Sequence, residues 1–286
     1  PVTTFATTAI GSEIPVMLVP AMHRSMYNHG IVQENVRLLK KNGLIFADPF
    51  IDETKAKMAS NDLVVLRVKQ ALGSHDLKEK KVLVIGGGTA EPVDAVRKLA
   101  NTSSGKMAVA CIMQAFLRDA KVSFWYGTGT ESFPEGIADV IRFETVDDLK
   151  KLIFTNDVLR FDIVIVCAAL SDFIPDKRLD KIPSTKNMLS IECSPADKII
   201  PLLRKKIKNA ILVGFKLEMN KEKLISKAMD LQKKYDLDFV IGNLTANMNA
   251  DQGEVWIIDE KENKVHLQGK KSMIADAMYD LIIEDF

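Results

Sequence analysis

A glycine-rich loop is the first segment of this sequence that could bind an anion. The loop consists of Gly86, Gly87, Gly88 and Thr89, and it follows the apolar stretch 82–85, which is expected to be a strand. Backbone amides of such a loop can hold a phosphate where a helix begins, and Pro92 suits the first turn of a helix over 92–99. The loop fails as a dinucleotide fingerprint because Glu91 takes the last small position, and no P-loop Lys-Ser/Thr pair follows. A plain tight turn remains an equal alternative.

The polar residues beyond the loop are the next candidates. Arg97 and Asn101 are four apart, so a helix that reaches Asn101 would place both on one face. The following Thr-Ser-Ser-Gly run, which includes Ser104, would supply hydroxyls and a cap for a helix over 106–118. Alternatively, Asn101 is an ordinary cap and Arg97 a solvated charge.

A second group of candidates follows a buried strand predicted at 161–168. Ala168 and Ala169 end this strand, and small residues at the carboxyl end of a central strand leave room for a ligand. Asp172 and Phe173 come next, and a polar loop beyond them contains Lys181. Taken by itself, Lys181 would be a solvated surface charge.

The elements that must position these residues alternate between short apolar strands and helices from residue 81 onward. This alternation predicts an α/β fold, a Rossmann-like, mostly parallel sheet with helices on both faces. Residues 254–258 and 264–267 are expected to form a C-terminal β-hairpin before a helix over 272–283. A small α/β segment precedes Gly73 and the charged run 78–81, so we expect two domains, 1–75 and 79–286.

Composition excludes several classes of protein. Lys+Arg 39 against Asp+Glu 38 is too balanced for a nucleic acid or membrane surface to be bound by bulk charge. The three cysteines lack metal or CxxC spacing, which suits a reducing compartment. No apolar run approaches the roughly 18 residues needed to span a bilayer, so a cytoplasmic location is expected.

Five segments, in order, resemble the phosphopantothenate–cysteine ligase family: Gly86–Pro92, Asn101–Met107, Ala168–Phe173, the Lys181 loop and Val213–Glu218. The resemblance implies that 4'-phosphopantothenate is activated by a nucleoside triphosphate, CTP rather than ATP, as an acyl-nucleotidylate with release of pyrophosphate. L-cysteine then attacks this intermediate in coenzyme A synthesis. It also implies Mg²⁺ and a homodimer.

The resemblance assigns roles to individual residues. Asn101 would orient the acyl carbonyl, Arg97 would hold the substrate, and Lys181 with Mg²⁺ would neutralise phosphate charge. Asp172 would contact the nucleotide and is the candidate metal ligand. The other nucleotide-binding candidates are Gly86, Gly87, Gly88, Thr89, Ser104, Ala168, Ala169, Phe173, Pro195, Asp197, Phe215, Lys233 and Lys234. Pro195 and Asp197 belong to a segment, 193–198, that is expected to open a helix.

The sequence departs from the family in two places. The family's Lys-x-Lys-Lys loop keeps only Lys181, because Pro183 and Ser184 replace the later lysines. Only one lysine can be placed on the nucleotide-contacting helix, at Lys233 or Lys234. A non-catalytic nucleotide-binding scaffold and an NAD(P)-dependent oxidoreductase are the alternative functions.

Residues 20–27 are similar to the Pro-x-Met-Asn motif of phosphopantothenoylcysteine decarboxylases, which are flavoproteins. His23 replaces the motif's asparagine, and no cysteine precedes Cys111 to act as the decarboxylase's acid. Decarboxylation and FMN binding are therefore not expected from this chain alone. Either residues 1–75 are a vestigial docking unit, or a separate flavoprotein decarboxylase supplies the missing half.

Overall fold

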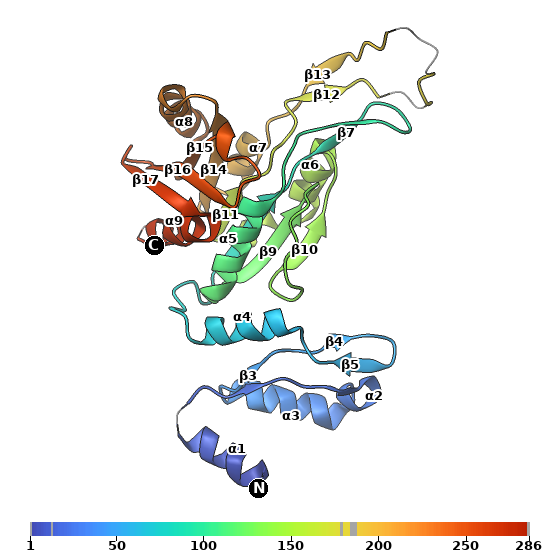
Figure 1. Ribbon diagram of the computed structural model, residues 1–286, viewed down its shortest axis with the longest axis vertical. Coiled ribbons are helices and arrows are strands. Elements are labelled where there is room, and N and C mark those ends of the chain that lie inside the picture. The colour runs from blue at the N-terminus through green and yellow to red at the C-terminus, as the bar shows by residue number, and fades with distance from the viewer. Residues whose placement is uncertain (1, 13, 178–179, 184–187, 285–286) are drawn as a thin grey trace. The chain divides into compact units, whose positions relative to one another are not determined.

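The computed structural model describes residues 2–12, 14–177, 180–183 and 188–284. The chain forms two compact units (Figure 1): residues 1–75 with two short segments around 118 and 135, and the remainder from residue 76 onward. Among the described residues, no helix has the length and apolar character to cross a bilayer.

The first unit contains short elements. Met17–Leu18 (β1) pairs in parallel with Ile45–Phe46 (β3), and a three-stranded antiparallel sheet has the order β2-β5-β4. The remaining elements are α1 (Val2–Gly11), β2 (Met22–His23), α2 (Arg24–Tyr27), α3 (Gly30–Lys41), β4 (Phe50–Ile51), β5 (Lys55–Lys57) and α4 (Asn61–Ala71). The first strand of the larger unit, β6, begins ten residues after α4 ends, at Lys81.

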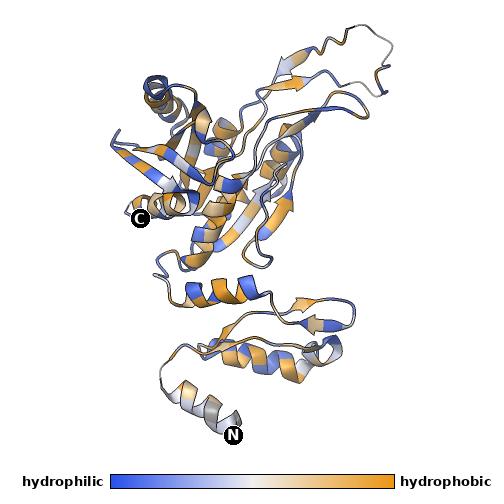
Figure 2. Cartoon of the chain, in the orientation of Figure 1, coloured by the Kyte–Doolittle hydropathy of each residue, from blue (hydrophilic) through white to orange (hydrophobic). Residues whose placement is uncertain are grey.

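The second unit is built on an eight-stranded sheet with the order β10-β9-β6-β11-β14-β15-β16-β17. Its six parallel strands are β6 (Lys81–Gly86), β9 (Lys121–Tyr126), β10 (Asp139–Arg142), β11 (Ile163–Val166), β14 (Ile211–Glu218) and β15 (Phe239–Leu244). The antiparallel hairpin of β16 (Gln252–Asp259) and β17 (Lys264–Lys270) extends one edge. Residues alternate between hydrophilic and apolar along β17, which suits an edge strand (Figure 2).

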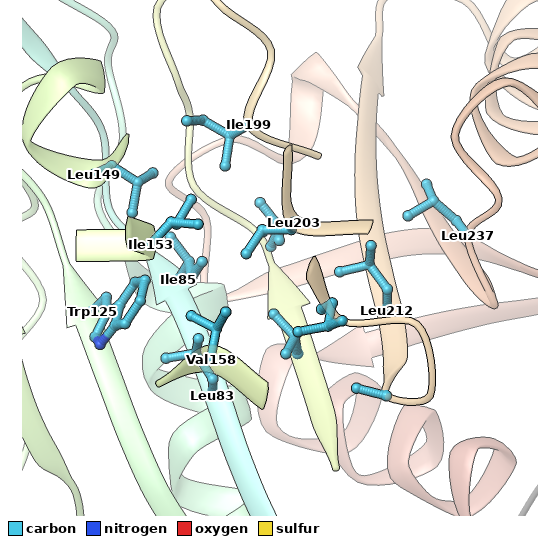
Figure 3. Close-up of a cluster of buried hydrophobic side chains, with 14 of the residues drawn as sticks. Leu83, Ile85, Trp125, Leu149, Ile153, Val158, Ile199, Leu203, Leu212 and Leu237 are labelled. Atoms are coloured by element: carbon cyan, nitrogen blue, oxygen red, sulfur yellow. The ribbon is translucent and has the colours of Figure 1, made fainter. Parts of the chain in front are cut away.

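Helices cover both faces of this sheet because successive strand residues point to opposite sides. Leu83 and Ile85 pack with α6 (Val146–Thr155), α7 (Ile199–Lys206) and α8 (Lys221–Tyr235) in one core cluster (Figure 3). On the other face lie α5 (Lys106–Leu117) and α9 (Lys271–Ile283), joined where Tyr279 Oη donates to the Cys111 carbonyl, 3.1 Å away. This arrangement confirms the predicted Rossmann-like α/β fold and its C-terminal hairpin.

Two antiparallel strand pairs extend away from the large sheet (Figure 1). One pair is β7 (Ala90–Pro92) with β8 (Lys98–Ala100), and the other is β12 (Phe173–Pro175) with β13 (Cys193–Pro195). β12 also contacts β7, so we call the four strands together the arm. The predicted helix over 92–99 is therefore wrong, since this stretch contains the turn of the β7–β8 hairpin.

The side chain of Asp94 explains why the hairpin forms. Its Oδ1 accepts hydrogen bonds from the backbone amides of Val96 (2.8 Å) and Arg97 (2.7 Å). Such local side-chain bonds offer the backbone an alternative to helical hydrogen bonding. Arg97 and Asn101 consequently do not share a helix face.

Candidate active site

A cavity of about 600 Å³ lies at the carboxyl ends of β11 and β14, beside the start of α5. This volume suits a small-molecule ligand. One wall consists of residues 101–108 and the other of residues 243–274, with residues 167–172 and 215–217 between them. Both walls belong to the larger unit, and every residue described as lining the cavity lies within residues 76–286.

The sheet topology accounts for the position of the cavity. From β6 the chain runs outward through β9 to β10, and then returns to β11 on the other side of β6. The strand order thus reverses between β6 and β11, and open α/β sheets bind ligands beside the strand ends at such a point. Cys167, Ala168 and Ala169 follow β11 directly and line the cavity.

Six of the predicted site residues line this cavity, and the others do not. Those on the lining are Asn101, Ser104, Ala168, Ala169, Asp172 and Phe215. Those outside it are Gly86, Gly87, Gly88, Thr89, Arg97, Phe173, Lys181, Pro195, Asp197, Lys233 and Lys234. The cavity therefore gathers residues from three of the five segments that resemble the ligase family, while the glycine loop and the Lys181 loop lie elsewhere.

Asn101 ties two loops of the cavity together. Its Nδ2 donates to the carbonyls of Ala169 (3.3 Å) and Leu170 (3.0 Å), and its backbone amide donates to Thr89 O (3.3 Å). The side chain remains exposed on the cavity wall. Asn101 therefore fixes the loop after β11 and is also accessible to a ligand.

The glycine loop packs against protein, and two of its amides already have acceptors. Gly88 N donates to Thr128 O (2.6 Å), and Thr89 N donates to Ala169 O (3.3 Å). A Cβ on Gly86 would lie 2.1 Å from that of Ala108, so glycine is needed for the close approach of α5. These contacts favour the tight-turn interpretation, and no helix follows the loop to strengthen an anion site.

Thr89 has a structural role beside this loop. Its hydroxyl lies 2.8 Å from Ser171 Oγ and accepts the Ser171 amide at 2.9 Å. Both side chains are buried. This pair holds the loop after β11 against the glycine loop.

The arm holds the Lys181 loop away from the cavity. Ile182 N donates to Asp94 Oδ2 (3.0 Å), and Arg97 Nη1 donates to Ile182 O (3.2 Å) as well as to Asp94 Oδ2 (2.6 Å). Lys181 itself is exposed. The structure thus brings Arg97 and Lys181 near each other, but it does not bring Lys181 to Asn101 within one chain.

The other predicted nucleotide contacts lie on surface elements. Pro195 ends β13, and α7 begins at Ile199 with Lys198 as its N-cap, so the segment 193–198 leads into a helix as expected, but Pro195 and Asp197 lie before it. Asp197 pairs with Lys150 at 2.5 Å. On α8, Lys233 pairs with Glu262 at 2.6 Å, and the Lys234 ammonium lies 5.2 Å from the Tyr235 ring centre.

Two lysines give one end of the cavity a positive charge. Lys106 and Lys271 begin α5 and α9, where helix dipoles add to the positive potential. Lys106 pairs with Asp251, and that hydrogen bond raises the pKa of Lys106. Burial and then the charge of Lys106 lower the pKa of Lys271.

No protein metal centre is found among the described residues, which contain no cluster of three His, Cys, Asp or Glu side chains. Asp172, the predicted metal ligand, instead pairs with Lys198 on the surface. Mg²⁺ usually binds one or two carboxylates together with substrate phosphates, so Asp172 alone does not make a complete magnesium site. We therefore assign no chemical step to a protein-bound Mg²⁺.

Asn249 and Lys271 are among the cavity residues that were not predicted from the sequence. Asn249 has a left-handed φ of 58°, and its Oδ1 accepts the Ser104 amide at 2.9 Å. Lys271 reaches the same region from the start of α9. A polar Asn-Met-Asn-Ala turn before the hairpin is the only sequence signal for the first, and no local signal marks the second.

The fold and the cavity define an α/β domain with a ligand-sized cavity at the switch point of its sheet. Residues 77–286 match the DNA/pantothenate metabolism flavoprotein C-terminal domain, and residues 1–73 match the flavoprotein family. The chain therefore belongs to the DNA/pantothenate metabolism flavoprotein family, as its resemblance to the ligases predicted.

Individual relatives agree with this assignment. The chain is 35% identical to the coenzyme A biosynthesis bifunctional protein CoaBC of Thermococcus kodakarensis, over 99% of this chain and 70% of that protein. It is 33% identical to the Methanocaldococcus jannaschii protein of the same name, over 94% of this chain and 66% of the relative. The crystal structure of the DNA/pantothenate metabolism flavoprotein from Streptococcus pneumoniae shares the fold, with a TM-score of 0.65 at 22% identity, covering 72% of this chain and 100% of that one.

Proposed function

We propose that residues 79–286 form a ligase domain that joins 4'-phosphopantothenate to L-cysteine in coenzyme A biosynthesis. The observation that carries this proposal is a cavity that gathers Asn101, Ser104, Ala168, Ala169 and Phe215 from distant parts of the chain. The relatives named for coenzyme A biosynthesis support the same pathway.

The chemistry requires activation, because a carboxylate does not react with an amine near neutral pH. We propose that a nucleoside triphosphate, CTP in preference to ATP, converts the acid to an acyl-nucleotidylate and that pyrophosphate leaves. The base would lie near Phe215, and Asn101 would orient the acyl carbonyl for attack by the cysteine amine by turning one Nδ2 hydrogen from the Ala169 or Leu170 carbonyl to the substrate. Preorganised polar groups of this kind stabilise charge that develops in the transition state.

We propose that Lys181 acts on the cavity of a partner subunit in a homodimer. Lys181 is exposed in the loop between β12 and β13 and does not line its own cavity. The arm also exposes apolar side chains, including Val96, Leu99 and Phe173, which a second copy would cover. A symmetric dimer would place each lysine in the opposite site.

Pyrophosphate release tests the function. Wild-type protein should release pyrophosphate from CTP only when phosphopantothenate is present, and cysteine should then yield the amide product. Lys181→Gln should lower turnover by roughly 100-fold if Lys181 stabilises developing charge. No pyrophosphate with any triphosphate would support a non-catalytic scaffold, and NADPH oxidation would support the oxidoreductase alternative.

Mixing two inactive variants tests the dimer. In an exchanged equimolar mixture of Asn101→Asp and Lys181→Gln, half the dimers are mixed, and each has one intact site if Lys181 acts on the partner. About a quarter of wild-type activity should therefore return. An inactive mixture whose subunits have exchanged would contradict the arrangement.

For residues 1–75 we propose a flavoprotein-like unit that does not decarboxylate by itself. Its match to the flavoprotein family and its parallel β1–β3 pair support this assignment. A separate flavoprotein decarboxylase that brings FMN is the partner we propose. Purification from native lysate should recover a yellow complex, and recovery without a flavin-containing partner would contradict the proposal.

A further inference from the structure

One buried carboxylate of the arm lies outside the cavity and is not used by the proposed chemistry. The Asp94 side chain is fully buried, with 0% exposure. Its Oδ1 shapes the β7–β8 turn through the Val96 and Arg97 amides, whereas its Oδ2 accepts from the Ile182 amide, 88 residues further along the chain. Asp94 therefore links the hairpin to the loop that carries Lys181.

Arg97 completes the link by bonding the backbone carbonyl of Ile182, whose amide is bonded by Asp94. Its Nη1 donates to Ile182 O at 3.2 Å, so Asp94 and Arg97 together bond both the N–H and the C=O of Ile182. The Ile182 side chain is also buried, with 5% of the residue exposed. We call these bonds the Ile182 clamp.

The Ile182 clamp also restrains Lys181, because Lys181 directly precedes Ile182 in the chain. Lys181 is exposed while its neighbour is held by two side chains and by packing. Fixing one residue restricts the directions in which the preceding side chain can point. We propose that Asp94 is a positioning residue that fixes Ile182 through this clamp and thereby aims the Lys181 ammonium at the activated phosphates.

This inference rests on the proposed ligase function, and the electrostatics of Asp94 are consistent with it. Hydrogen bonds from the amides of Ile182 and Val96 lower the pKa of Asp94 to about 2. The carboxylate is therefore ionised at neutral pH and can accept from all its donors. A neutral amide of the same shape cannot accept at both of its ends.

Asp94→Asn is the variant that tests the role. Its oxygen can still accept in the turn, while its NH₂ group would face the Ile182 N–H and the Arg97 guanidinium. We expect faster hydrogen exchange in peptides that contain the Ile182 amide. We also expect a kcat for pyrophosphate release that is roughly 100-fold lower, with KM for phosphopantothenate unchanged, because a small displacement of a catalytic group costs about that much.

Lys98→Gln is the matched control. Lys98 lies on the same hairpin but pairs with Glu144 at the surface, so exchange and turnover should stay at wild-type values. Arg97→Gln is a second variant in case Asp94→Asn does not fold, since it removes only the bond to Ile182 O and one bond to Asp94. It should shift exchange in the same direction by a smaller amount.

The double variant Asp94→Asn/Lys181→Gln separates positioning from a general loss of structure. If Asp94 acts through Lys181, the double variant should be no slower than Lys181→Gln alone, since coupled residues are not additive. Multiplied losses, or unchanged exchange around Ile182 in Asp94→Asn, would overturn the inference. If wild-type protein releases no pyrophosphate, the ligase function is refuted and the positioning role of Asp94 with it. Hydrogen exchange of the Ile182 amide would still show whether the clamp exists.

Discussion

Gly105 at the start of α5 is a site where a single methyl group should strongly destabilise the larger unit. Its φ is +80°, and a Cβ built there would lie 2.3 Å from Tyr126 Oη and 2.7 Å from Cε2. The Tyr126 ring has little room to move, because it stacks on Phe124 with ring centres 4.6 Å apart and is 1% exposed. Gly105→Ala therefore combines backbone strain with an overlap that cannot relax easily.

The expected magnitude follows from these two effects. A left-handed backbone costs alanine about 1 kcal/mol, and overpacking a rigid site costs about 2 kcal/mol. The free energy of unfolding should thus fall by about 3 kcal/mol. For a unit of this size each kcal/mol lowers Tm by ~2–4 °C, so Tm should fall by roughly 6–12 °C.

Tryptophan fluorescence during thermal unfolding is a suitable assay, because both tryptophans, Trp125 and Trp256, are buried in the larger unit. Gly253→Ala is the matched control. Gly253 also lines the cavity, its φ is not left-handed, and an added Cβ would lie 3.6 Å from Ile274 Cδ1, an ordinary contact. A Gly105→Ala protein that unfolds at the control's temperature would refute this reasoning.

Three further predictions concern polar groups of the same unit. Asn101→Asp should cost about 1 kcal/mol in urea unfolding at pH 7, because a carboxylate cannot donate to the Ala169 and Leu170 carbonyls, and cysteine should consume the activated intermediate poorly. Hydrogen bonding lowers the pKa of Asp94 to about 2, below its ordinary value of 3.8. The ionised side chain therefore contributes its full stabilisation above pH 3.8 and loses it as the pH falls through about 2. Asp94→Asn should remove this acid-dependent loss from a plot of unfolding free energy against pH. Asp238→Ala should cost about 2 kcal/mol in chemical denaturation, less than for a fully buried pair because 32% of the Asp238 side chain is exposed. The reason is that Asp238→Ala leaves Arg204 and the Leu212 amide without their shared acceptor. An unchanged denaturation midpoint would show that solvent replaces this acceptor fully.

The fold was predictable from the sequence where local pattern and tertiary packing agree. The apolar stretches that became β6, β9 and β11 are buried on both faces, so their composition alone identifies parallel strands. The stretch 92–99 was mispredicted because Asp94 bonds the Val96 and Arg97 amides instead of joining a helix, and its other oxygen is held by Ile182, a partner that lies 88 residues away. No window of neighbouring residues contains that information.

The candidate site was predictable to a similar extent. Residues near the carboxyl ends of strands, such as Ala168 just after β11 and Phe215 within β14, line the cavity because topology places those ends together. Lys181 was expected in the same cavity, but the arm holds its loop elsewhere. Lys271 is the first residue of α9, and nothing in the neighbouring sequence indicates that it lines a ligand site. Its role depends on how β16 and β17 fold back, which single-sequence patterns do not specify.

The two walls of the cavity also determine when it can form during synthesis. One wall is translated near residue 101, while Lys271 and Ile274 of the other emerge from the ribosome some 170 residues later. At typical elongation rates of ~5–20 residues per second, the first wall waits roughly 10–30 seconds for the second. Ligands that bind this cavity can therefore stabilise only nascent chains extended past Ile274, and they cannot assist the folding of shorter ones.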